Sequence, residues 1–152
     1  MMKTIIALLI TALSIANISH AQTKETREVG TFSEISYRVS GKLFLRQGSP
    51  QKVVLEGDSD VLAEIETELK GNRLIIGNRN SSSWFNWNDN SRDRINVYIT
   101  VENINALSVS GSGDLLAETI IKSENLDLNI SGSGSMELQV NLTGNQIGRA
   151  HV

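Results

Sequence analysis

The amino-acid sequence predicts an all-β fold in which strands stack as a parallel solenoid with coils of about 21 residues. Two observations predict it. The tetrapeptide Ser-Gly-Ser-Gly occurs twice, and the second copy follows the first by 21 residues. Each copy also ends a stretch of alternating apolar and polar residues, so each unit has the pattern of strand, tight turn and strand. The residues of the predicted turns are Ser110, Gly111, Ser112, Gly113, Ser131, Gly132, Ser133 and Gly134.

The repeated unit favours parallel strands, because its internal order recurs without reversal. Val109 of the first unit corresponds to Ile130 of the second, and such pairs lie in register only when successive coils run in the same direction. Glycine at the corners permits the positive φ angles that a side chain penalises. The alternative is an antiparallel sandwich of hairpins, which favours two-residue turns between strands of reversed order.

Further strands are predicted from β-branched or alternating segments. They occupy residues 32–39, 43–45, 53–55, 74–76 and 95–101. A weaker copy of the repeat extends from Tyr37 to Leu43, and Ser49-Pro50 is a predicted turn.

The segment after Gly57 has a different pattern. Asp58 and Asp60 offer helix-capping side chains, and apolar residues then recur every three or four positions as far as Leu69. We expect a short helical or irregular segment here, with a twisted strand as the alternative. Gly71-Asn72 is a predicted hairpin-type turn.

The N-terminus has the pattern of a secretory signal peptide over residues 1–21. Lys3 precedes an apolar run, and Ala21 ends a stretch of small residues suited to cleavage before Gln22. An uncleaved anchor helix is the alternative, although the run is shorter than the roughly 20 residues that a bilayer needs. We therefore expect export to the periplasm, the cell surface or the medium, and no membrane-spanning segment after cleavage.

The mature chain divides into three parts by composition. We expect residues 22–30 to form a polar leader, residues 31–145 the repeat-containing domain, and residues 146–152 a non-native tail. The last six residues, from Ile147, resemble the translation of a sequencing adapter, so we expect the domain to be incomplete at its C-terminus. A genuine short polar tail is the alternative.

Composition excludes several kinds of chemistry. The chain has no cysteine, and its two histidines are His20 in the signal segment and His151 in the tail. Catalytic triads, cysteine dyads and ordinary zinc sites are therefore excluded from the domain, and we expect no cofactor, no metal and no enzymatic activity. The net charge of −3 and the scattered basic residues exclude nucleic acid as a partner.

Carboxylates are the remaining candidates for chemistry. Asp114 and Glu118 are candidates for a hydrolytic pair, but Asp114 corresponds to Ser135 in the next unit, so that unit supplies no partner and a solvated turn is favoured. Asp58 and Asp60 suit capping better than calcium binding.

The best candidate for ligand binding is a segment rich in Asn and Ser between residues 78 and 93. Its aromatic faces could stack on sugar rings while neighbouring amides bind hydroxyl groups. The alternative is that these rings fold back and cover the end of the core. The candidate ligand-binding residues are Trp84, Phe85, Asn86, Trp87 and Asn88.

The repeat and its flanking strands resemble the head GIN domain of putative auto-transporter adhesins. The residues that carry the resemblance are the two Ser-Gly-Ser-Gly units and the segments Phe32–Ile35, Leu43–Gly48, Leu74–Ile76 and Val97–Val101. The resemblance implies a right-handed parallel β-helix with a pectin-lyase-like shape, and an exported protein that acts in adhesion.

We therefore expect a non-enzymatic binding module that contacts a surface glycan or a surface protein. Two alternatives are a carbohydrate-active enzyme whose catalytic residues lie on coils outside this chain, and a purely structural envelope protein.

Overall fold

The computed structural model describes residues 22–79 and 95–143. The described residues form three β-sheets and one short helix, α1 (Ser59–Glu64). Sheet A has the order β1 (Thr23–Arg27), β4 (Lys52–Gly57), β7 (Asn96–Val101), β3 (Lys42–Gln47), β9 (Asp114–Ala117), β12 (Ser135–Glu137). Sheet B has the order β11 (Asp127–Gly132), β8 (Ala106–Gly111), β2 (Glu34–Tyr37), β6 (Arg73–Asn78), β5 (Ile65–Lys70). Sheet C pairs β10 (Ile121–Ser123) with β13 (Val140–Leu142).

The prediction of a right-handed parallel β-helix with a pectin-lyase-like shape is wrong. Both large sheets mix parallel and antiparallel strands: β4 runs antiparallel to β7 and β1, and β5 runs antiparallel to β6. The hairpin turn at Gly71-Asn72 explains part of the difference. Lys70 pairs with Arg73 across a two-residue turn, which reverses the chain instead of continuing it in the same direction.

The predicted register of the two strong repeats is confirmed. Strand β11 pairs with β8 in parallel, so that Val109 lies opposite Ile130, and β12 pairs with β9 in the same way. The weaker copy joins the same stack, because Tyr37 of β2 lies opposite Val109 and β3 pairs in parallel with β9. The parallel arrangement therefore holds for the repeats but not for the chain as a whole.

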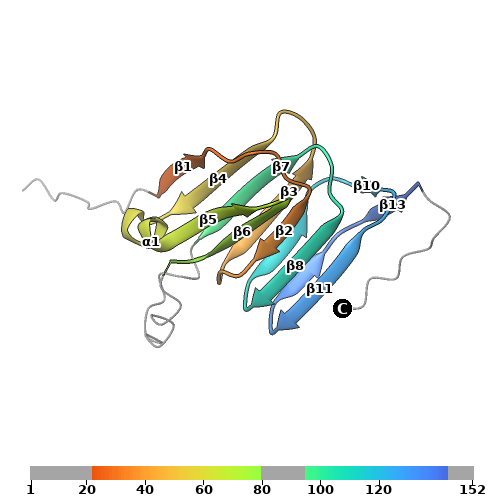
Figure 1. Cartoon of the computed structure of the whole chain (residues 1–152). Helices are drawn as coiled ribbons and strands as arrows, with labels where there is room; N and C mark the ends of the chain where they lie inside the picture. The colour runs from red at the N-terminus through yellow and green to blue at the C-terminus, as the bar shows by residue number, and fades with distance from the viewer. Residues whose placement is uncertain (1–21, 80–94, 144–152) are drawn as a thin grey trace, which may run out of the picture.

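One continuous apolar core lies between the sheets. The inward side chains of β3 and β7 alternate with outward ones, and Leu43, Leu45 and Val97 have no exposed surface. Inward residues of sheet B belong to the same cluster, and Figure 1 shows β2, β6 and β8 side by side in front of the strands of sheet A. Burial of these aliphatic side chains is the main stabilising contribution in a chain without disulfides.

Two segments between residues 22 and 70 differ from the sequence-based expectation. The polar leader contains a strand, since β1 pairs with β4 along its whole length. The helical segment after Asp58 is only α1, and from Ile65 onward the backbone is extended as β5. Asp58 occupies the N-cap position of α1 without a side-chain capping hydrogen bond.

The glycine-serine turns connect β8 to β9 and β11 to β12, at the end of the sheets opposite sheet C (Figure 1). Gly111 and Gly132 have φ angles of 90° and 102°, which favour glycine. Gly113 is required for a different reason. A Cβ atom there would overlap the Val39 carbonyl oxygen and lie 2.6 Å from Cε1 of Tyr37.

We expect Gly113→Ala to lower the free energy of unfolding by about 2 kcal/mol or more, because neither the Val39 backbone nor the buried Tyr37 ring can move away without disturbing the core. Gly48→Ala is the matched control. A Cβ atom at Gly48 meets only Thr100 Cγ2 at 3.8 Å, an ordinary contact. Urea unfolding of both variants gives the comparison, and equal stabilities would contradict the assigned packing.

Candidate functional site

The structure brings the eight predicted turn residues together as a stack. The amides of Ser133 and Gly134 donate to the Gly111 carbonyl oxygen at 2.9 and 3.0 Å. The weaker copy joins this stack through its own serine, because Ser40 Oγ lies 2.9 Å from Ser112 Oγ. The polar groups of the turns thus bind neighbouring turns, which is what a structural role requires.

The aromatic candidates of the sequence analysis lie outside the described residues. Trp84, Phe85, Asn86, Trp87 and Asn88 belong to the segment between β6, which ends at Asn78, and β7, which begins at Asn96. Their role in ligand binding stays a prediction.

Asp114 and Glu118 each have a polar partner. Asp114 lies opposite Ser135, as the repeat predicts, and the Ser135 hydroxyl donates to Asp114 Oδ1 at 2.6 Å. Glu118 accepts from Arg46 through both Nε and Nη2, at 3.3 and 3.2 Å.

The outward face of sheet A carries a pair of aromatic rings that the sequence analysis did not select. Phe44 and Tyr98 lie opposite each other on the neighbouring strands β3 and β7. Their ring centroids are 5.1 Å apart and their planes differ by 13°. Leu43, Leu45, Val97 and Ile99 point inward, so the alternation of the two strands places both rings outward. We call this pair the aromatic platform.

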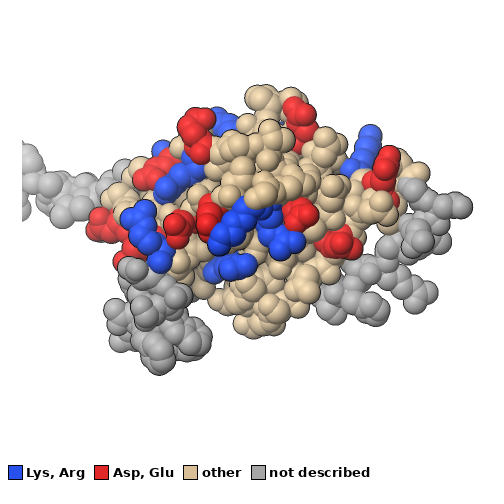
Figure 2. Space-filling model, in the orientation of Figure 1, with Lys and Arg blue, Asp and Glu red and all other residues tan. Residues whose placement is uncertain are grey.

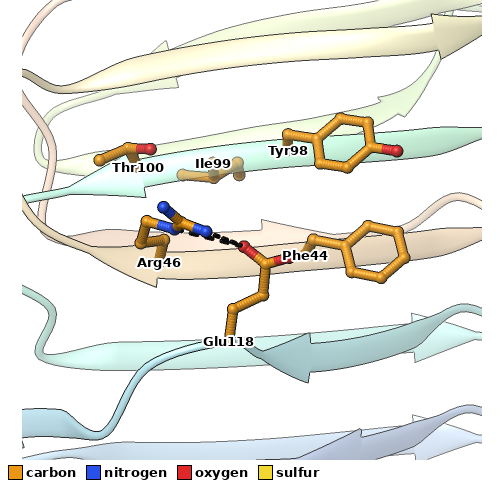
Figure 3. A pocket seen from close by; sticks show the side chains of 6 residues that line it. All are labelled: Phe44, Arg46, Tyr98, Ile99, Thr100 and Glu118. Atoms are coloured by element: carbon orange, nitrogen blue, oxygen red, sulfur yellow. Dashed lines mark hydrogen bonds and ion pairs between the residues drawn. The ribbon is translucent and has the colours of Figure 1, made fainter.

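A shallow hollow of about 350 Å³ adjoins the aromatic platform. Its lining residues are Phe44, Arg46, Tyr98, Ile99, Thr100 and Glu118. Figure 3 shows both rings projecting the same way from adjacent strands, with Arg46 and Glu118 pointing toward each other beside them. The site therefore combines exposed ring surface with donors and acceptors for hydrogen bonds.

Lys24 and Glu56 complete the surroundings of Tyr98. The Lys24 ammonium lies 5.7 Å from the Tyr98 ring centroid and 3.6 Å from a Glu56 carboxylate oxygen. Partial burial, followed by the nearby Glu56 carboxylate, raises the pKa of Tyr98 above its ordinary value of 10.0. Tyr98 is therefore neutral at physiological pH and remains a hydrogen-bond donor.

A second tyrosine, Tyr37, lies in the core below the turns. It has no exposed surface, and its hydroxyl has no hydrogen-bond partner among the described residues. Burial, with a smaller contribution from the Asp114 charge, raises the pKa of Tyr37. The Tyr37 hydroxyl thus stays neutral and takes no part in an exposed site.

The signal for the aromatic platform was present in the sequence. Tyr98 is the only aromatic residue among the outward positions of the alternating strand 95–101, and Phe44 interrupts Leu43 and Leu45 at an outward position. A single outward aromatic residue is common on strands, and only the pairing of two such rings makes a contiguous apolar surface. The pairing of Phe44 with Tyr98 could not be predicted, because it depends on two strands that are far apart in the sequence.

Two other features were sought in the described part of the chain, a metal site and a membrane-spanning helix. No group of three or more His, Cys, Asp or Glu residues within it is placed to hold a metal ion. No helix in the same residues is long and apolar enough to cross a bilayer. On the face seen in Figure 2, acidic and basic side chains lie next to one another, without a large area of one sign.

The architecture is that of a β-sheet domain with mixed sheets and stacked glycine turns. Comparison of the sequence with models of known families shows which family the chain belongs to. The family model for the putative auto-transporter adhesin, head GIN domain, matches residues 31–148. The chain belongs to this family, as the residues of the two repeats indicated. No curated protein matches the chain.

Solved structures share the fold at low sequence identity. A putative adhesin from Bacteroides fragilis is 21% identical with a TM-score of 0.70, and the match covers 81% of this chain and 56% of that one. A putative lipid binding protein from Parabacteroides distasonis is 20% identical with a TM-score of 0.67, covering 80% of this chain and 51% of that one. The chain thus spans about half the length of both structures.

We expect a titration of tyrosine absorbance to show Tyr98 ionising above the ordinary tyrosine value. Glu56→Gln should bring the Tyr98 pKa closer to that value, although burial will keep it raised. Because the folded pKa is raised, the contribution of Tyr98 to stability is complete below the unfolded pKa and is lost as pH rises through the folded one. A Tyr98 pKa that does not respond to Glu56→Gln would contradict the proposed contact.

Proposed function

We propose that the chain is a non-enzymatic binding module of an exported protein, and that the aromatic platform binds a glycan. The single observation that carries the proposal is the outward stacked pair of Phe44 and Tyr98 beside the ion pair of Arg46 and Glu118. Membership in a family described as putative adhesins supports a role in binding. The signal-like residues 1–21, which lie outside the described residues, support export to the periplasm, the cell surface or the medium.

A sugar ring fits this chemistry. One face of a pyranose presents C–H groups that pack against aromatic rings, while its edge presents hydroxyl groups. Arg46 donates and Glu118 accepts, so together they match a hydroxyl, which does both. The side chains of Arg46 and Glu118 are 59% and 37% exposed, so a ligand can reach them without opening the fold.

The carboxylates near the platform support binding over hydrolysis. A glycosidase needs two carboxyl groups on opposite sides of the scissile bond, one of them free to donate a proton. Asp114 accepts from Ser135, Glu118 pairs with Arg46, and Glu56 pairs with Lys24. Each of these three carboxylates therefore already has a hydrogen-bond or ion-pair partner within the protein.

There are two alternatives to a glycan-binding module. The chain could bind a protein ligand, or it could be a purely structural protein of the cell envelope. A flat protein surface would need a larger contact area than the platform alone supplies. A purely structural protein would show no dependence of ligand binding on Phe44 or Tyr98.

The test is a glycan array probed with the full chain, followed by calorimetry on any glycan that binds. We expect the Phe44→Ala and Tyr98→Ala variants each to weaken binding by about tenfold, through loss of ring contact with the sugar. Ile75→Ala is the matched control, because Ile75 is a partly exposed aliphatic residue of sheet B. Unchanged binding in both aromatic variants would contradict the assignment, and release of new reducing ends from a polysaccharide would favour the enzyme alternative.

The predicted aromatic segment is tested separately. We propose Trp84 and Trp87 as a second contact for the same ligand class, so that Trp84→Ala and Trp87→Ala weaken glycan binding without changing the melting temperature. The opposite result, a lower melting temperature with intact binding, would assign these rings to the core.

A further inference from the structure

The aromatic platform is the centre of a longer apolar stripe. Val54 of β4 lies opposite Tyr98, Tyr98 opposite Phe44, and Phe44 opposite Leu116 of β9. All four side chains point outward, and Leu116 is 37% exposed. We call these four residues the apolar stripe. Each member sits on a different strand, so the stripe crosses sheet A at right angles to the strands.

The length of the stripe is defined at both ends. On β1, the next residue in register is Thr26, and on β12 it is Glu137, so polar side chains follow the apolar ones on each side. Neighbouring strands are about 4.8 Å apart, so the three intervals between the four strands span about 14 Å. The stripe therefore suits an elongated ligand better than a single compact one.

Two polar rows border the stripe along its whole length. One row consists of Glu56, Asn96, Lys42 and Asp114, and the other of Lys52, Thr100, Arg46 and Glu118. Each row contains charges of both signs as well as neutral donors and acceptors. This composition favours a neutral ligand with hydroxyl groups along its two edges over an anionic polymer.

We propose that the ligand is a neutral, linear, β-1,4-linked glycan that lies along the apolar stripe, with successive sugars over successive strands. This inference rests on the proposed function and specifies its ligand class. An extended β-1,4-linked chain of glucose-like pyranoses forms a flat ribbon whose faces carry axial C–H groups and whose edges carry equatorial hydroxyls. Its faces fit the stripe, and its edges fit the two polar rows.

The spacing of the ribbon also fits. The rise per sugar in an extended β-linked chain is close to the distance of about 4.8 Å between strands, so each ring can lie over one member of the stripe. An α-1,4-linked chain coils, and its later sugars would leave the sheet. The apolar stripe therefore favours one glycosidic linkage over another and also favours a particular length of the sugar chain.

The experiment is a calorimetric titration of the full chain with two oligosaccharide series, from monosaccharide to hexasaccharide. One series is β-1,4-linked glucose and the other is α-1,4-linked glucose. We expect the Kd for the β-linked series to fall by about tenfold between the dimer and the tetramer and then to level off, because the stripe ends after four strands. The α-linked series should gain nothing beyond the dimer.

Leu116→Asn shortens the stripe at one end. We expect it to remove most of the gain in affinity of the β-linked tetramer over the dimer, and an undiminished gain would contradict the assigned stripe. Ile120→Asn is the matched control, because Ile120 is 52% exposed and lies outside the stripe. Circular dichroism of both variants checks that the fold is retained.

The outcomes separate this inference from the proposed function. If glucose and its dimer bind but longer β-linked chains bind no more tightly, or if α-linked chains gain equally, the extended ligand is wrong and the glycan site stands. If no member of either series and no glycan on the array binds, both proposals are overturned.

Discussion

The hydrogen-bonded register between neighbouring parallel strands is the constraint on which the rest of the structure depends. It places Tyr37 over Val109 and Val109 over Ile130, so that the inward side chains form one core. The same ladders place outward residues over outward residues, because side chains alternate with a period of two. A slip of one residue in any strand would send its apolar side chains into solvent and remove the surface rows at the same time.

Part of the fold could be predicted because equivalent residues of two successive repeats pair with each other in neighbouring parallel strands. The offset between the Ser-Gly-Ser-Gly units gave the pairing of β8 with β11, and Gly71-Asn72 gave a hairpin. The same hairpin should have argued against a wholly parallel chain. The antiparallel position of β4 beside β7 could not be predicted, because no local pattern records which of two distant apolar strands will pair.

The candidate site, like the fold, could be predicted from the sequence only in part. Composition and family resemblance favoured binding over catalysis, and local clustering of aromatic residues was the criterion for the candidate site. It selected the cluster from Trp84 to Trp87 because those rings are adjacent in sequence. Phe44 and Tyr98 become adjacent only through the pairing of β3 with β7, which supplies a contact between residues far apart in the chain. Surface sites on sheets are generally of this kind, since a face is assembled across strands.

The half-buried rings of Phe44 and Tyr98 are fixed to the middle of a six-stranded sheet, and this has a consequence for the kinetics of binding. A preformed surface loses little conformational entropy on association, so encounters need no slow rearrangement. A shallow, open contact also releases its ligand quickly. For the glycan ligand proposed above, single contacts would then be brief, and firm attachment would require many copies acting at once on a repetitive polymer, where avidity replaces individual affinity.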